Sequence, residues 1–118
     1  MNKALRLIVI MIVAIWGSSC GDVTVRRYDH APDAPTGVKA TAGNELVSVE
    51  WDWVQGATSY NIYWKTSPGV TTSDSKFADK LSPYFHTDLT EGTTYYYAVT
   101  AENEHGESGL SAEASAKP

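Results

Sequence analysis

Residues 89–111 constrain the fold more than any other stretch, because their side chains alternate between two faces. Every second side chain from Tyr95 to Ala101 is aromatic or aliphatic, and a period of two in such a segment is typical of a half-buried strand. Gly92 and Gly106 lie at the two ends of the segment and can take the positive φ that tight reversals need. The stretch therefore predicts a central strand between two turns.

The chain from residue 36 onward repeats this alternation in short segments separated by turn residues. The predicted inward positions are, in chain order, Val38, Ala40, Val47, Val49, Trp51, Tyr60, Ile62, Trp64, Tyr84 and His86. Residues 71–80 are polar and predict a loop with a weak edge strand, and residues 111–116 predict the last strand. No segment has helical periodicity. Seven short strands of this kind predict an all-β fold, a sandwich of two antiparallel sheets.

Over residues 35–118 the pattern resembles the fibronectin type III family. The residues that carry the resemblance are Trp51, Tyr60, Asn61, Ile62, Tyr63, Leu89, Tyr95, Val99, Ala101, Asn103, Gly106, Ser108 and Ser111. The resemblance implies an immunoglobulin-like sandwich in which Leu89 and Tyr95 form a tyrosine corner, whose phenol hydroxyl bonds to upstream backbone. It also implies that Trp51 is the partner of Tyr95 across the core, so that all three residues are structural.

Residues 1–19 have the organisation of a signal peptide for export. Lys3 and Arg6 precede an apolar run of about ten residues, and small residues occupy positions 17–19. A transmembrane anchor is the alternative, but a spanning helix needs about 20 apolar residues. We expect a lipidated N-terminus and flexible tether over residues 20–34 and the folded domain over residues 35–118.

Cys20 is the only cysteine, and the segment before it resembles the signal of bacterial lipoproteins. In those proteins the cysteine receives a diacylglyceryl group and becomes an acylated first residue. Gly17 stands where such signals usually carry an aliphatic residue, so ordinary signal cleavage is the alternative. The resemblance implies a lipid-anchored protein of the bacterial cell envelope. Because Gly21 rather than aspartate follows the cysteine, the enterobacterial sorting scheme favours the outer membrane, on either its periplasmic or its surface face.

The composition argues against several classes of function. From residue 20 onward, 7 basic residues face 14 acidic ones, and such a surface repels the phosphates of nucleic acids. One cysteine forms no intrachain disulfide and no thiolate metal site. The sequence has no glycine-rich phosphate loop, no nucleophile elbow and no histidine pair at metal-ligand spacing. We expect no catalysis, no cofactor, no metal and no nucleic-acid partner, and we expect a monomer.

His86 and His105 differ in the environment that the sequence predicts for them. His86 alternates with Tyr84 on an inward face, which predicts a hydrogen-bonded core histidine rather than a ligand. His105 lies in the turn between the last two strands, beside Glu104 and Glu107. A solvated turn residue is the main interpretation of His105, and pH sensing or weak metal binding is the alternative.

The candidate ligand contacts are three aromatic residues, Trp53, Tyr63 and Tyr96. Trp53 lies where a strand should end, and the two tyrosines occupy outward positions of neighbouring strands, where aromatic rings can stack on sugars or anchor a protein. The alternative is that the tyrosines only stabilise the sheet and Trp53 covers the end of the sandwich.

Two functions fit these observations. One is a lipid-anchored, non-catalytic interaction or structural module of the envelope, whose partner is an envelope protein or a polysaccharide. The other is a carbohydrate-binding accessory protein that uses the surface aromatics.

Overall fold

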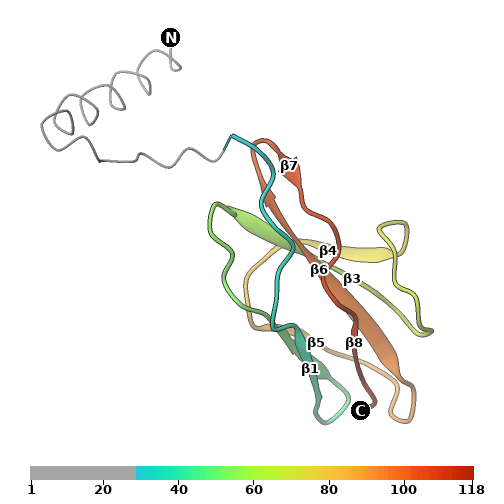
Figure 1. Cartoon of the computed structure of the whole chain (residues 1–118). Helices are drawn as coiled ribbons and strands as arrows, with labels where there is room; N and C mark the ends of the chain where they lie inside the picture. The colour runs from blue at the N-terminus through green and yellow to red at the C-terminus, as the bar shows by residue number, and fades with distance from the viewer. Residues whose placement is uncertain (1–28) are drawn as a thin grey trace, which may run out of the picture.

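The computed structural model describes residues 29–118 as two antiparallel sheets packed face to face (Figure 1). The smaller sheet has the order β1-β2-β5 and consists of β1 (Lys39–Ala42), β2 (Val47–Glu50) and β5 (Tyr84–His86). The larger sheet has the order β4-β3-β6-β7, with β8 also paired to β6, and consists of β3 (Ser59–Lys65), β4 (Ser75–Lys80), β6 (Tyr95–Asn103), β7 (Gly106–Glu107) and β8 (Ala114–Ala116). The predicted all-β sandwich is confirmed. The predicted signal peptide, Cys20 and the first part of the tether lie outside the described residues.

Strand β6 is the central strand, as its alternation predicted. It pairs with β3 along its length, with Ile62 opposite Val99 and Tyr60 opposite Ala101. On its other side it pairs with β7 and then with β8. Within residues 29–118, no helix is found that is both long and apolar enough to cross a membrane.

The last strand predicted over residues 111–116 contains β8, but the chain that pairs with this edge of β6 begins earlier, at Gly106, and is divided into β7 and β8. Between these pieces, the backbone N–H groups of Ser108 and Ser111 still donate to Ala101 and Val99 carbonyls, at 2.7 and 2.9 Å. The two serine hydroxyls accept in return from the N–H groups of Ala101 and Val99, each at 2.9 Å. Serine oxygens therefore replace backbone carbonyls over the interrupted stretch, so the edge of β6 stays paired.

The core lies between the sheets and is rich in aromatic side chains. Its buried members are Val47, Val49, Trp51, Tyr60, Ile62, Leu89, Tyr95, Tyr97, Val99 and Ala101. Trp51 follows the end of β2 directly and packs on Tyr60, with ring centroids 5.5 Å apart. Tyr95 packs instead on Trp64, at 5.9 Å. Trp51 and Tyr95 thus share one core, but their rings pack on different aromatic neighbours rather than on each other.

Part of the predicted tether lies against the domain. The Asn103 side-chain amide donates to the His30 carbonyl at 2.9 Å, and Pro32 and Pro35 are buried. The described chain therefore enters beside the β6–β7 turn, at the opposite end from the C-terminus (Figure 1). Packing begins a few residues before the expected boundary at residue 35.

Candidate functional site

A hollow of about 330 Å³ lies between the loop after β2 and the loop before β5. It is lined by Trp51, Trp53, Tyr60, Leu81 and Ser82. The Trp53 side chain is 73% exposed and that of Leu81 is 71% exposed, so both offer apolar surface to solvent. Small-molecule sites are commonly concave and aromatic, with few polar groups. The hollow is therefore the candidate ligand site.

Two hydrogen bonds fix the loops that form the hollow. The Trp51 backbone N–H donates to the Ser82 hydroxyl at 3.0 Å, which joins the end of β2 to the loop before β5. The Val54 N–H donates to the Tyr60 hydroxyl at 2.8 Å, which holds the loop after β2 against β3. Both walls are thus held by contacts within the protein.

Trp51 also contributes an unsatisfied donor. Its side chain is 6% exposed, and among the described residues no acceptor lies within hydrogen-bond reach of its buried Nε1–H. A buried donor left unpaired costs roughly 1 to 3 kcal/mol. Trp51 is thus buried in the core, but its indole N–H makes no hydrogen bond with the described residues.

Tyr63 is not a surface aromatic, so the expected exposure of this candidate contact is wrong. It is 2% exposed, and its hydroxyl donates to Glu107 Oε2 at 2.6 Å. The Lys76 ammonium lies 5.7 Å from the centroid of its ring. Burial, followed by the contact with Glu107, raises the pKa of Tyr63 to about 12. The outward face of β3 is covered by side chains from β7 and β4, which the alternation of β3 does not reveal.

Glu107 is the centre of a polar network on this face. The Thr100 hydroxyl and the Asn61 amide donate to the same Oε2 atom, the latter at 3.1 Å. Asn61 also donates to Glu102 Oε1 at 3.0 Å. Burial alone would raise the pKa of the Glu107 carboxyl, but the hydrogen bonds from Thr100, Tyr63 and Asn61 outweigh it and lower this pKa below its usual value. These groups bind one another, which is typical of a structural network.

The three predicted aromatic contacts do not form one patch. Tyr96 is half-buried and packs with Tyr63, Val70, Ala98 and Leu110 on the outer face of the larger sheet. Trp53 lines the hollow formed by the loops after β2 and before β5. Ligand contact by Trp53 or Tyr96 stays a prediction.

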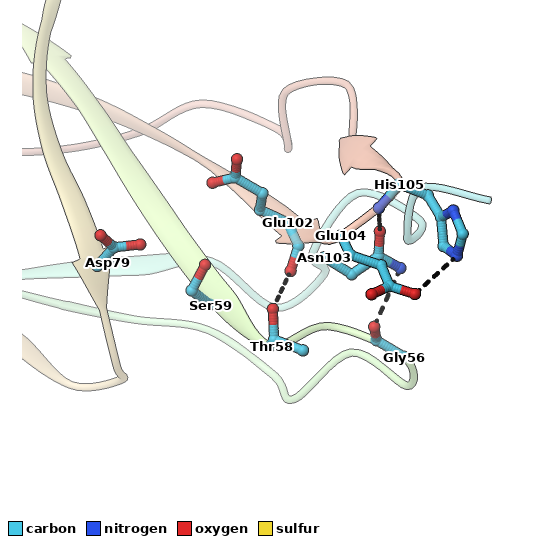
Figure 2. A pocket seen from close by; sticks show the side chains of 8 residues that line it. All are labelled: Gly56, Thr58, Ser59, Asp79, Glu102, Asn103, Glu104 and His105. Atoms are coloured by element: carbon cyan, nitrogen blue, oxygen red, sulfur yellow. Dashed lines mark hydrogen bonds and ion pairs between the residues drawn. The ribbon is translucent and has the colours of Figure 1, made fainter. Parts of the chain in front are cut away.

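A larger groove of about 630 Å³ lies near the β6–β7 turn, and Figure 2 shows the side chains that line it. It is lined by Gly56, Thr58, Ser59, Asp79, Glu102, Asn103, Glu104 and His105. His105 Nε2 lies 3.4 Å from Glu104 Oε2, and its backbone N–H donates to the Asn103 side chain at 2.8 Å. Thr58 donates to the Glu102 carbonyl at 3.1 Å. Many of the polar groups of this groove thus pair with one another, and residues 29–118 contain no cluster of three or more side chains suited to a metal ion.

His86 is a hydrogen-bonded core histidine, which confirms that prediction. Its Nδ1 atom and the Tyr97 hydroxyl are hydrogen-bonded at 2.9 Å. Trp64 and Phe77 contact its ring edge to face, with centroids 4.5 and 4.9 Å away. Desolvation by this apolar surround lowers the pKa of His86.

Three residues at the surface or in the hollow were not predicted from the sequence: Leu81, Ser82 and Phe85. Phe85 is 54% exposed and lies between the inward Tyr84 and His86, so the alternation of β5 indicates that Phe85 faces outward. Leu81 is an isolated leucine in a turn before Pro83, which is a weaker signal. Nothing local in the sequence places either Leu81 or Ser82 beside Trp53, because that contact joins two loops.

The fold and its corner define the class of this domain. The Tyr95 hydroxyl accepts a hydrogen bond from the Thr90 backbone N–H at 3.0 Å, and Leu89 is buried in the core. A two-sheet antiparallel sandwich with this corner is an immunoglobulin-like β-sandwich. The chain belongs to the fibronectin type III family, because the model of the Fibronectin type III domain matches residues 33–117.

The chain spans only a small part of the length of the amylopullulanases and the depolymerase that it matches. Three amylopullulanases match; that of Thermoanaerobacter thermohydrosulfuricus is 42% identical over 91 residues, which is 75% of this chain but 6% of that protein. Poly(3-hydroxybutyrate) depolymerase of Ralstonia pickettii is 38% identical over 88 residues, 73% of this chain and 17% of that protein. The crystal structure of FN3tt has a TM-score of 0.60 and 31% identity, covering 74% of this chain and 94% of that one. Domains of this family are generally non-catalytic modules, although relatives are parts of enzymes.

Proposed function

We propose that this chain is a lipid-anchored, non-catalytic module of the bacterial cell envelope. The observation that carries the proposal is the apolar run after Lys3 and Arg6, which ends in Gly17-Ser18-Ser19-Cys20. Membership of a generally non-catalytic family supports the proposal that the module is non-catalytic. Acylated Cys20 would hold the protein on the membrane, since each buried CH₂ contributes about 0.8 kcal/mol and several chains anchor firmly.

The tether would join the domain beside the β6–β7 turn, where Asn103 holds His30. This end of the sandwich would therefore be nearer the membrane. The loops of the opposite end, beside the C-terminus, would face away from it (Figure 1).

Metabolic labelling with a fatty acid tests the anchor. Cys20→Ser should abolish labelling and release the protein from the membrane fraction, because no other thiol is present. Ser19→Ala is the matched control, since it keeps a small residue before the cysteine and should label as the wild type does. Labelling that persists in Cys20→Ser, or is absent in the wild type, would contradict the proposal.

The outer membrane is the proposed location, because Gly21 follows Cys20. In an enterobacterial host, Gly21→Asp should move most of the protein from the outer-membrane to the inner-membrane fraction of a density gradient. A wild-type protein that already fractionates with the inner membrane would contradict this location.

Carbohydrate binding is the second candidate function. Two observations favour it: the match to three amylopullulanases and the exposed Trp53 ring beside a hollow. A panel of polysaccharides tested against the full chain checks it. Failure to bind any of them removes this candidate without affecting the lipid anchor.

A further inference from the structure

We propose that the hollow formed by Trp51, Trp53, Tyr60, Leu81 and Ser82 binds a neutral glycan, with one sugar ring stacked on Trp53. The proposal rests on the carbohydrate-binding candidate and adds the site and the charge class of the ligand. Its first support is chemical: a sugar ring has an apolar C–H face and a hydroxyl edge. The hollow offers apolar surface from Trp53 and Leu81 together with the Ser82 hydroxyl.

The charge of the lining selects a neutral ligand. None of the five lining side chains carries a charge at neutral pH, and burying a charge without a partner is costly. Over residues 29–118 the chain has 13 acidic and 5 basic residues, so an anionic polymer would also be repelled at longer range. Phosphate-bearing and uronic-acid polymers are therefore disfavoured.

The polar atoms of the hollow suit hydroxyl groups. The Ser82 oxygen accepts from the Trp51 backbone N–H, which leaves its proton free to donate to a sugar oxygen. The Trp51 indole N–H has no acceptor among the described residues. This nitrogen is itself buried from solvent, so the hydrogen bond to a ligand in the hollow would come from the Ser82 hydroxyl.

The hollow is held in place before a ligand arrives. Its two loops are fixed by the bonds from Trp51 to Ser82 and from Val54 to Tyr60. A site fixed in this way loses little conformational freedom on binding, which favours affinity for a small ligand. Its volume of about 330 Å³ lies at the lower end of the range of roughly 300 to 1,000 Å³ for small-ligand sites.

A folded protein partner fits this surface less well. Stable protein interfaces bury about 800 Å² on each side around an apolar centre. Among the described residues, the exposed large hydrophobic side chains are Trp53, Leu81 and Phe85, and Phe85 does not line the hollow. The exposed apolar surface is therefore suited to a sugar unit rather than to a broad interface.

Titration calorimetry on the full chain in detergent tests the site. The probes are pullulan and a soluble neutral β-glucan, with alginate as an anionic polysaccharide and poly(3-hydroxybutyrate) particles as a non-carbohydrate polymer. Trp53→Ala should weaken binding of at least one neutral glycan by about tenfold or more, as expected for loss of a central aromatic contact. Trp53→Phe should retain most of the affinity, and Leu81→Ala should weaken it several-fold.

Phe85→Ala is the matched control, because it removes another exposed aromatic side chain outside the hollow and should bind as the wild type does. Circular dichroism and thermal melting establish that each variant is folded. If a neutral glycan binds equally well to wild type, Trp53→Ala and Leu81→Ala, the hollow is not the site, although the carbohydrate-binding candidate stands. If no neutral glycan binds, both the hollow as a glycan site and the carbohydrate-binding candidate are rejected. Tighter binding of alginate or of the polyester would also overturn the proposal.

Discussion

The Tyr63 hydroxyl donates to the Glu107 carboxylate at 2.6 Å and so joins two strands that are not paired with each other. In the larger sheet β6 lies between β3 and β7, and the side-chain contact passes over Thr100 of β6, which also donates to Glu107. This contact converts an outward tyrosine into a buried one. It also covers the outer face of the larger sheet beside the short strand β7.

Tyr63→Phe should lower the free energy of unfolding by about 1 to 3 kcal/mol, because it removes a hydrogen bond to a charged group. Chemical denaturation at pH 7 measures the change. Tyr96→Phe is the control, since Tyr96 lies in the same cluster but its hydroxyl has no such bond within residues 29–118, and it should have little effect. Equal, small effects of the two changes would mean that the Tyr63 bond contributes nothing to stability.

The lowered pKa of Glu107 predicts a loss of stability in acid. The carboxylate contributes stability above its ordinary pKa of 4.5, and this contribution is lost as the pH falls through the lower pKa of the folded state. In Glu107→Gln the part of the pH dependence due to this group should be absent. Denaturation curves from pH 7 to pH 3 provide the measurement, and an unchanged slope in the variant would contradict the assignment.

His86 predicts a second loss of stability at milder pH. Because burial lowers the pKa of His86 from 6.5, the unfolded chain takes up a proton at a higher pH than the folded domain does. Stability is therefore full above about pH 6.5 and falls below it. His86→Phe should remove this slope between pH 7 and pH 5. A slope that persists unchanged would assign it to other groups.

Tyr95→Phe tests the tyrosine corner. It keeps the ring that packs on Trp64 but deletes the hydroxyl that accepts from Thr90. The expected cost is about 1 to 3 kcal/mol if the Thr90 N–H is left unpaired. A neutral result would mean that water replaces the phenol and that the corner is not a stabilising feature.

Local alternation predicted the two sheets and the core from the sequence. The period of Tyr95, Tyr97 and Val99 indicated β6, and the position of His86 indicated a core histidine. Contacts over long sequence separations could not be predicted in this way. Glu107 covers Tyr63 from 44 residues away in the sequence. The outward position of Tyr63 in the alternation therefore did not reveal that its side chain is buried.

The candidate site was only partly predictable for the same reason. Trp53 stood out as an aromatic residue beyond the expected end of a strand. Its partners Leu81 and Ser82 belong to a loop that the Trp51–Ser82 hydrogen bond brings to it, and a contact between loops has no periodic signal. The last strand was predicted over residues 111–116, which contain β8, but β7 was not predicted. Between these two strands Ser108 and Ser111 pair with β6 through their hydroxyls, which strand periodicity does not register.

The most direct test of the central proposal is intact-mass and peptide mass spectrometry of the protein extracted from membranes. We expect a chain that begins at Cys20 and carries fatty acyl groups, so its N-terminal peptide should be heavier than the unmodified peptide by the mass of those groups. A chain that retains Met1, or one that begins with an unmodified Cys20, would contradict the proposed lipid anchor.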